Sequence, residues 1–238
     1  GLEFPTHMSQ CDRPDTRRLD VRASLRTIGD EWLVRVNRQR AGIAVHAIVD
    51  VSASMTFGDP RWKRHVAADF IEALGLSAFR VGDAFGVLAF DAKERTDLYA
   101  PARVGRGGGY FVAERLRTLA ADAGTAAGIE EAVTHLAGRQ GLVFLVSDFH
   151  WPLERLDAVL DLLAHAHVVP IVVWAPSETQ PPTRDALAVL HDVESGSQRT
   201  IWLRSSVRDR WRNAVAHRRE ELNDLFAMHS ILPFYIEG

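Results

Sequence analysis

A continuous apolar run, Ile43 to Val49, constrains the fold of this 238-residue chain more than any other feature. A strand without alternating polar residues is buried on both faces, and such strands belong to parallel sheets that helices cover. Further apolar runs follow at 84–90, 141–148 and 168–174, and segments with apolar residues at helical spacing separate them. The alternation predicts an α/β fold with a Rossmann-like, doubly wound, mostly parallel sheet flanked by helices.

The remaining elements are predicted from the same patterns. A short strand at 95–102 is expected to run antiparallel at an edge of the sheet. Pro170 lacks an N–H donor, which predicts an edge position or an irregular start for the strand that holds it. Helices are expected at 62–76, 110–122, 126–138, 153–165 and 207–226, a hairpin at 192–204 and a final strand at 231–236.

Charge and cysteine content limit the classes of function. The chain holds 28 Lys and Arg against 31 Asp and Glu, a formal net charge of −3, so nucleic-acid binding is not expected. A single cysteine, Cys11, allows no internal disulfide and fits a reducing, cytoplasmic location. No apolar stretch reaches the ~18 residues that cross a bilayer, so no membrane span is expected in this chain.

Three segments are expected along the chain. Residues 1–7 look like an expression-vector remnant ahead of a native Met8, and residues 1–10 together are expected to be a vector remnant and disordered start. Residues 11–42 are polar and rich in arginine, which predicts an irregular or partly helical lead-in. Residues 43–238 show neither an internal repeat nor an interdomain linker, and are interpreted as a single globular domain.

Oxygen-bearing side chains follow the first apolar run. Asp50, Ser52 and Ser54 stand on alternate residues where the strand is expected to leave the sheet, and Asp148 ends a later strand. Thr125 follows a glycine in a loop that can fold over the same edge, where open α/β sheets gather their ligands. Oxygen ligands alone favour Mg²⁺, Mn²⁺ or Ca²⁺ over zinc. The alternative is that the aspartate and the serines only cap the next helix.

The three motifs together are similar to a known site. Asp-x-Ser-x-Ser after a first buried strand, Gly-Thr in a later loop and Ser-Asp at a later strand end resemble the metal-ion-dependent adhesion site (MIDAS) of von Willebrand factor A (vWA) domains. The resemblance implies that the hydroxyls of Ser52 and Ser54 hold a divalent cation directly, with Mg²⁺ expected and Mn²⁺ or Ca²⁺ as alternatives. It implies that Thr125, Asp50 and Asp148 bind directly or through waters. The open coordination position would accept an Asp or Glu of a protein partner.

The flanks resemble the DUF58 branch of these domains. Arg18 to Thr27 is similar to the segment before the first strand in that branch, with Val21 and Leu25 in place of the usual Trp and Ala. The C-terminal part also looks like DUF58, so that the resemblance covers about residues 15–238. It implies a MoxR-type AAA+ ATPase as partner, and an adaptor or co-chaperone role in the maturation of another protein complex. No catalytic or organic cofactor-binding residues are expected.

Three residues after the second strand end are candidates for a partner-docking rim: Phe149, His150 and Trp151. Phe149 stands where related domains often have glycine, and the alternative is that its side chain packs under the loop.

Two other functions compete with the adhesion-type site. A Mg²⁺-dependent, phosphatase-like hydrolase would use Asp50 as nucleophile, but it needs a second aspartate as general acid where Ser52 stands. A metal-free interaction module would dispense with the oxygen ligands, all five of which are present in the sequence.

Overall fold

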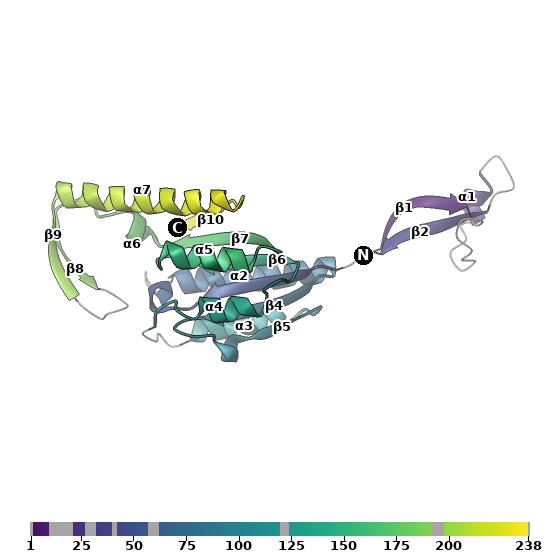
Figure 1. Ribbon diagram of the computed structural model, residues 1–238, viewed down its shortest axis with the longest axis horizontal. Helices are drawn as coiled ribbons and strands as arrows, with labels where there is room; N and C mark the ends of the chain where they lie inside the picture. The colour runs from purple at the N-terminus through teal and green to yellow at the C-terminus, as the bar shows by residue number, and fades with distance from the viewer. Residues whose placement is uncertain are drawn as a thin grey trace. The chain divides into compact units, whose positions relative to one another are not determined.

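The chain divides into two units, Gly1–Gly42 and Ile43–Gly238, in the computed structural model (Figure 1). The structure describes residues 2–9, 21–26, 32–39, 42–56, 62–119, 124–191 and 198–237. Several predictions fall partly or wholly outside these residues: Cys11, the end of the helix expected at 110–122, and the turn of the hairpin expected at 192–204.

The shorter unit contains an antiparallel strand pair. β1 (Leu2–Ser9) pairs with β2 (Leu33–Gln39), and α1 (Val21–Ser24) is joined to β2 by a 2.9 Å hydrogen bond from the Leu33 N–H to the Ser24 hydroxyl. The prediction of a disordered start and an irregular lead-in differs from this arrangement. A weak period-two pattern, Leu-x-Phe-x-Thr-x-Met, is typical of a strand and accounts for the difference.

The apolar runs form a six-stranded sheet in the longer unit (Figure 1). Its strand order is β10-β7-β6-β3-β4-β5, and all neighbours are parallel except β4 and β5. The bounds are β3 Ala44–Asp50, β4 Ala84–Phe90, β5 Ala100–Arg103, β6 Leu142–Ser147, β7 His167–Trp174 and β10 Phe234–Glu237. The predicted fold class, a mostly parallel sheet with one antiparallel edge strand and flanking helices, is confirmed.

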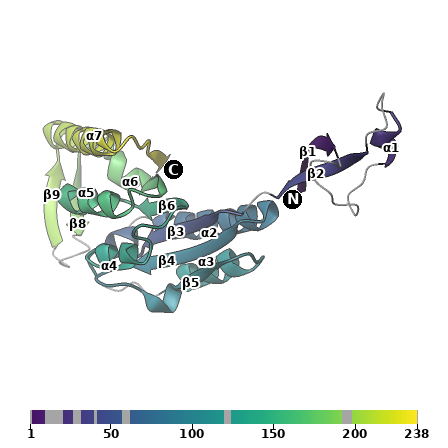
Figure 2. The same ribbon diagram turned by 45° about the vertical axis from the view of Figure 1, so that its right-hand side comes forward.

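Helices cover both faces of this sheet (Figure 1, Figure 2). The first face packs against α2 (Trp62–Val81) and α3 (Gly108–Thr118), whose apolar side chains join one buried cluster with alternate residues of β3 and β4. The second face packs against α4 (Ile129–Thr134), α5 (Leu153–Leu162) and α7 (Ser205–Met228) in a second cluster. A Cβ on Gly75 of α2 would lie 2.9 Å from the Cα of Gly109, so the close approach of α2 and α3 requires glycine there.

Short elements complete the longer unit. They are η2 (Ala53–Thr56), η3 (Thr96–Leu98), α6 (Pro176–Thr179), and the antiparallel pair β8 (Ala186–His191) and β9 (Gln198–Leu203). β9 leads directly into α7 (Figure 2).

Several predicted boundaries change. The edge strand expected at 95–102 is η3 followed by β5, and the helix expected at 126–138 is only the six-residue α4 followed by turns. β7 is not an edge strand, but β10 pairs with it only from Ile171 onward, so Pro170 precedes the doubly paired part. Among the described residues, no helix combines the length and apolar character that crossing a membrane requires.

Candidate metal centre

Asp50 occupies the carboxyl end of β3, at the edge where the sequence predicts a metal site. Its side chain is buried, and both carboxylate oxygens accept hydrogen bonds: Oδ1 from the Ser52 N–H at 2.9 Å and Oδ2 from the Ser147 hydroxyl at 2.6 Å. Burial and the nearby Asp148 carboxylate raise the pKa of Asp50 to about 6, against these hydrogen bonds, which lower it. Among the described residues, no Lys, Arg or His side chain forms an ion pair with this carboxylate.

The two serines lie beside this carboxylate. Ser52 begins the turn into η2, and the Oγ atoms of Ser52 and Ser54 are 3.2 Å apart. The Ala53 N–H donates to the Gly124 carbonyl at 2.9 Å, which holds the loop carrying Thr125 against this turn. Thr125 itself is exposed, and in the part of the chain that the structure describes no hydrogen bond joins its hydroxyl to the other four candidates.

Asp148 follows β6 and meets a buried ammonium group. The Lys63 Nζ donates to Asp148 Oδ2 at 2.7 Å and to Glu178 Oε1 at 2.6 Å, and the side chains of Lys63 and Asp148 are fully buried. Burial alone would raise the pKa of Asp148, but Lys63, His150 and the Ser54 hydroxyl together hold that pKa below its usual value. Asp148 is therefore kept as a carboxylate by a cation that the chain itself supplies.

His150 and Glu178 border the same cluster. The imidazole of His150 stacks on the ring of Trp174 with centroids 6.2 Å apart, and its Nε2 lies 3.6 Å from Glu178 Oε1. Burial lowers the pKa of His150, but the carboxylates of Glu178 and Asp148 outweigh burial and raise it. Possible ligand atoms of Asp148, His150 and Glu178 all lie within 4.8 Å of one another, around the region where the Lys63 ammonium contacts both carboxylates.

Two of the three predicted rim residues are in the core. Phe149 is 1% exposed and Trp151 6% exposed, so the prediction that they form a docking surface is wrong. The Phe149 ring packs on Phe226 of α7 with centroids 5.5 Å apart, and the Arg218 guanidinium donates to the carbonyls of both Phe149 and Trp151 at 2.7 and 2.6 Å. Only His150 remains exposed.

The backbone of Phe149 explains why glycine suits this position. Its φ is +53°, a conformation that is uncommon for bulky residues and easy for glycine. The burial of the ring offsets this local cost, so the chain keeps a phenylalanine in a glycine-like conformation.

The sequence interpretation assigned no role to three residues of the cluster: Lys63, Glu178 and Ser147, the last of which it noted only as part of the Ser-Asp motif. The Ser147 hydroxyl donates to Asp50 and accepts from the Phe149 N–H at 2.9 Å and from Trp151 Nε1 at 3.0 Å. Lys63 could have been found, because it lies four residues before Ala67 on the buried stripe of α2. Glu178 gave no such signal, because it belongs to a one-turn helix 115 residues away along the chain.

The donor set fits a hard divalent cation, but the Lys63 ammonium already contacts one of its carboxylates. Asp50, Ser52, Ser54 and Asp148 present only oxygen atoms, which Mg²⁺ prefers, and they belong to neighbouring segments at one sheet edge. The Lys63 ammonium already neutralises part of this negative charge. A divalent cation bound through Asp148 would therefore compete with Lys63 for the same carboxylate.

Comparisons with known proteins find a matching family and sequence relatives over most of the chain. The family described as "Protein of unknown function DUF58" matches residues 12–221. The uncharacterized protein Rv1480 of Mycobacterium tuberculosis is 28% identical over 215 residues, which are 87% of this chain and 65% of that protein. The chain thus spans about 65% of the length of the curated relatives it matches.

Solved structures resemble the chain at low identity. The hypothetical protein BatB from Bacteroides thetaiotaomicron is 16% identical, with a TM-score of 0.50 over 83% of this chain and 91% of that chain. The VWA domain of SpRpn10 is 13% identical, with a TM-score of 0.43 over 83% and 89% of the two chains. The likeness to BatB concerns the fold alone.

Proposed function

The chain belongs to the DUF58 family, and we propose that its longer unit is a single vWA-like domain that docks a protein partner through a bound divalent cation. Asp50, Ser52, Ser54, Thr125 and Asp148 are the proposed ligands, and Mg²⁺ is the proposed ion. The observation that carries the proposal is the meeting of the first three residues with Asp148 at one sheet edge. The Ser52 N–H donates to Asp50, the hydroxyls of Ser52 and Ser54 are in contact, and the Ser54 hydroxyl bonds Asp148.

Each residue has a separable task in this proposal. Asp50 fixes the turn that follows β3, because its Oδ1 holds the Ser52 N–H and thereby sets the position of the two serine hydroxyls. Ser147 orients Asp50 from the neighbouring strand. A hard cation at these oxygens would supply a Lewis-acidic contact for a carboxylate. The partner is therefore proposed to present an Asp or Glu side chain, beside the exposed His150.

The hydrolase alternative has less support from the geometry. Asp50 is 1% exposed, so a substrate the size of a phosphate ester does not reach its carboxylate. Ser52, two residues further on, is not a general acid at neutral pH. We therefore propose an interaction module, with no catalytic step.

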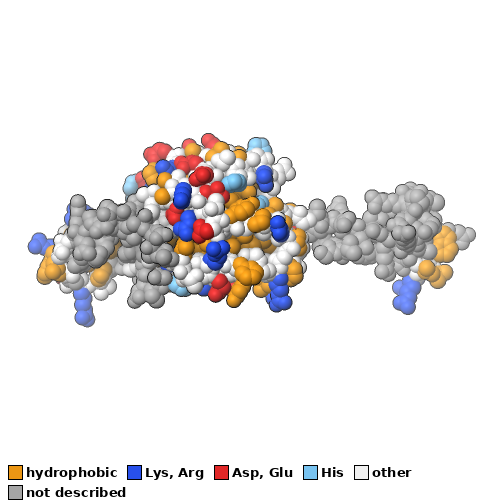
Figure 3. Space-filling model, turned by 90° about the horizontal axis from the view of Figure 1, so that it is seen from below, with side chains coloured by type: hydrophobic (Ala, Val, Ile, Leu, Met, Phe, Trp, Pro, Cys, Tyr) orange, Lys and Arg blue, Asp and Glu red, His pale blue; other side chains and the backbone are white. Residues whose placement is uncertain are grey.

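The partner class rests on the family resemblance. We propose that the partner is a MoxR-type AAA+ ATPase, with this protein as adaptor or co-chaperone in the maturation of another complex. On the face seen in Figure 3, acidic, basic and apolar side chains are interspersed, and neither charge sign dominates that face as it does on nucleic-acid-binding surfaces.

Calorimetry with Mg²⁺ and Mn²⁺ tests the metal. The wild type is expected to bind, Asp50→Ala is expected to lose binding, and circular dichroism is expected to show an intact fold in both. Asp91→Ala is the matched control, because Asp91 follows the neighbouring strand β4 and pairs with Arg95 instead of the cluster. Equal ion binding by the wild type and Asp50→Ala would refute the proposal.

A pull-down with and without EDTA tests the partner. An AAA+ ATPase is expected in the fraction retained by the wild type with Mg²⁺, and it should be lost with EDTA and with Asp50→Ala. Retention of the ATPase by Asp50→Ala in EDTA would show that docking is independent of the metal.

A further inference from the structure

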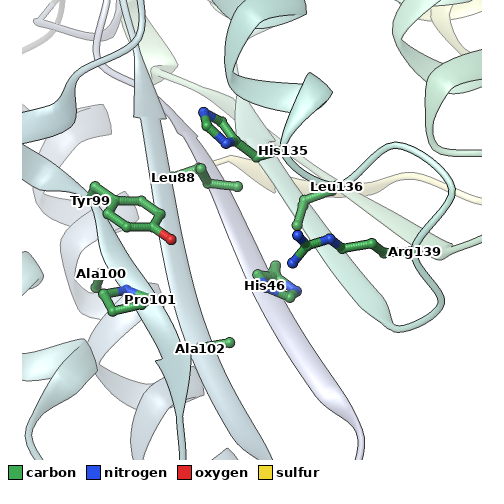
Figure 4. A pocket seen from close by; sticks show the side chains of 9 residues that line it. All are labelled: His46, Leu88, Tyr99, Ala100, Pro101, Ala102, His135, Leu136 and Arg139. Carbon is green, nitrogen blue, oxygen red and sulfur yellow. The ribbon is translucent and has the colours of Figure 1, made fainter.

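A second polar cluster lies on β3, away from the candidate metal centre (Figure 4). His46 is four residues before Asp50, which is about 13 Å along an extended strand. It lines a pocket of about 250 Å³ on the face of the sheet that α4 covers in part. Leu88, Pro101 and Leu136 form apolar walls, and Tyr99 and Arg139 add polar groups at the sides.

The pocket exists because two elements on this face are short or curved. α4 ends at Thr134, and the turns that follow carry Leu136 and Arg139 past the sheet without covering it. On the other side, a Cβ on Gly86 would lie 2.8 Å from the Ala102 nitrogen, so β5 passes directly over this position of β4 and forms a wall. On β4 the partner of His46 is Gly86, which has no side chain, so His46 meets open space on that side; on β6 its partner is Val143.

Three hydrogen-bond donors converge on this space. Figure 4 shows the guanidinium of Arg139 and the hydroxyl of Tyr99 pointing inward from opposite sides, with the His46 imidazole between them. In the described ranges the structure gives no hydrogen bond or ion pair to any of these three groups. His135 at the rim differs, because its Nε2 lies 2.9 Å from Glu94 Oε2.

The chemistry of the lining selects a ligand class. Arginine is charged at every physiological pH, and its planar fork of donors matches a carboxylate or phosphate bidentately. Burial and the Arg139 charge lower the pKa of His46, so the imidazole is neutral at pH 7 and offers one N–H. A pocket of about 250 Å³ suits a ligand of a few non-hydrogen atoms. The apolar walls favour a short hydrocarbon part over a fully polar anion.

We propose that this pocket binds a small organic monocarboxylate, with Arg139 gripping the carboxylate and Tyr99 and His46 donating to it. The ligand contacts the protein only, so binding is independent of the metal centre. The probe is butyrate, titrated calorimetrically into protein that has been stripped with EDTA and then freed from EDTA by gel filtration. Butyramide, which keeps the shape without the charge, and inorganic phosphate are the comparison ligands.

Butyrate is expected to bind the wild type, and Arg139→Gln is expected to weaken that binding at least tenfold. Tyr99→Phe is expected to weaken it several-fold, and histidine ring signals of His46 should shift on titration in nuclear magnetic resonance spectra. Arg80→Gln, at the exposed end of α2, is the matched control and should bind as the wild type does. Asp50→Ala should also bind normally, which separates this site from the metal centre.

Each contrary outcome counts against the proposal. Equal binding by Arg139→Gln, or equal binding of butyramide and butyrate, would overturn the assignment of an anion site. Binding of phosphate without butyrate would overturn the carboxylate assignment, and no binding of either anion would overturn the site.

Discussion

Replacing Lys63 with methionine tests both the buried cluster and its relation to the metal. The substitution keeps a long unbranched side chain and removes the charge. Lys63 and Asp148 are fully buried, and Glu178 is only 17% exposed, so water cannot replace the lost contacts at 2.7 and 2.6 Å. Removal of one partner from a buried ion pair costs about 3–5 kcal/mol. Lys63→Met is therefore expected to lower the free energy of unfolding by about that amount without divalent ions.

Divalent ions should reverse part of this loss. The variant leaves the carboxylates of Asp148 and Glu178 with ligand atoms within 4.8 Å of each other and without the Lys63 ammonium. Two unit charges 4 Å apart interact by about 4 kcal/mol at an effective dielectric constant of 20, and a divalent ion doubles the repulsion from an ammonium. The loss of that repulsion is expected to strengthen Mg²⁺ binding at least tenfold, which is about 1.4 kcal/mol.

Urea unfolding with and without Mg²⁺ measures both effects. Unfolding is followed by circular dichroism, because Trp174 is one of six tryptophans and its fluorescence is not resolved from the others. Arg117→Met is the matched control. Arg117 likewise pairs with several carboxylates, three in its case, but they lie on partly exposed helix surfaces. Its loss should therefore cost at most about 1 kcal/mol and leave the Mg²⁺ response unchanged.

Two results would refute this reasoning. One is a Lys63→Met variant as stable as the wild type, and the other is Mg²⁺ binding that is weaker in the variant than in the wild type. If Lys63→Met does not fold, the double variant with Glu178→Gln removes one of the two facing charges and should restore folding together with tight Mg²⁺ binding.

Three further predictions concern the surroundings of the two sites. Ser147→Ala leaves the Asp50 carboxylate and two buried N–H groups without their partner, so urea unfolding should show a loss of about 2–4 kcal/mol. Phe149→Gly relieves about 1–2 kcal/mol of backbone strain but removes a buried ring worth about 3–5 kcal/mol, so a net loss of about 1–4 kcal/mol is expected; a gain in stability would contradict it. Burial lowers the pKa of His46, so the folded state binds the imidazole proton less tightly than the unfolded state does. Wild-type stability should therefore be complete above pH 6.5 and fall as the pH drops through the folded-state pKa. His46→Gln should lose this part of the pH dependence, as measured by thermal unfolding at pH 5–8.

The sheet was predictable because its strands are buried on both faces. β3, β4, β6 and most of β7 are nearly unbroken apolar runs, and their alternation with helical spacing leaves few arrangements other than a parallel sheet. The meeting of Asp50 with Asp148 follows from that sheet, because β3 and β6 are neighbours and run parallel. Neighbouring parallel strands always have their carboxyl ends at the same edge of the sheet, so no knowledge of the loops is needed to place these two residues there.

The charges around the site were not predictable in the same way. A lysine near the start of a helix is normally a solvated residue, and only its place on the apolar stripe of α2 marks Lys63 as buried. Its second partner, Glu178, is positioned by the turn after β7, which depends on how α6 and α7 pack: Trp211 Nε1 of α7 donates to the Glu178 carbonyl at 2.6 Å. No local pattern encodes such a contact.

The length of α4 determines whether the pocket over His46 is open. The sequence predicts a helix over 126–138. The helix instead stops at Thr134, and Gly138 adopts a φ of +71°. A longer helix would continue over β3 and β4, and the one polar side chain within the apolar run of β3 before Asp50, His46, would then be buried without a partner. The early end of α4 instead opens a pocket over His46 and places Arg139 at its side. The early end of α4 and the histidine in β3 therefore belong together: the first opens the pocket and the second lines it. A polar ligand in that pocket would provide hydrogen-bond partners for His46 and Arg139.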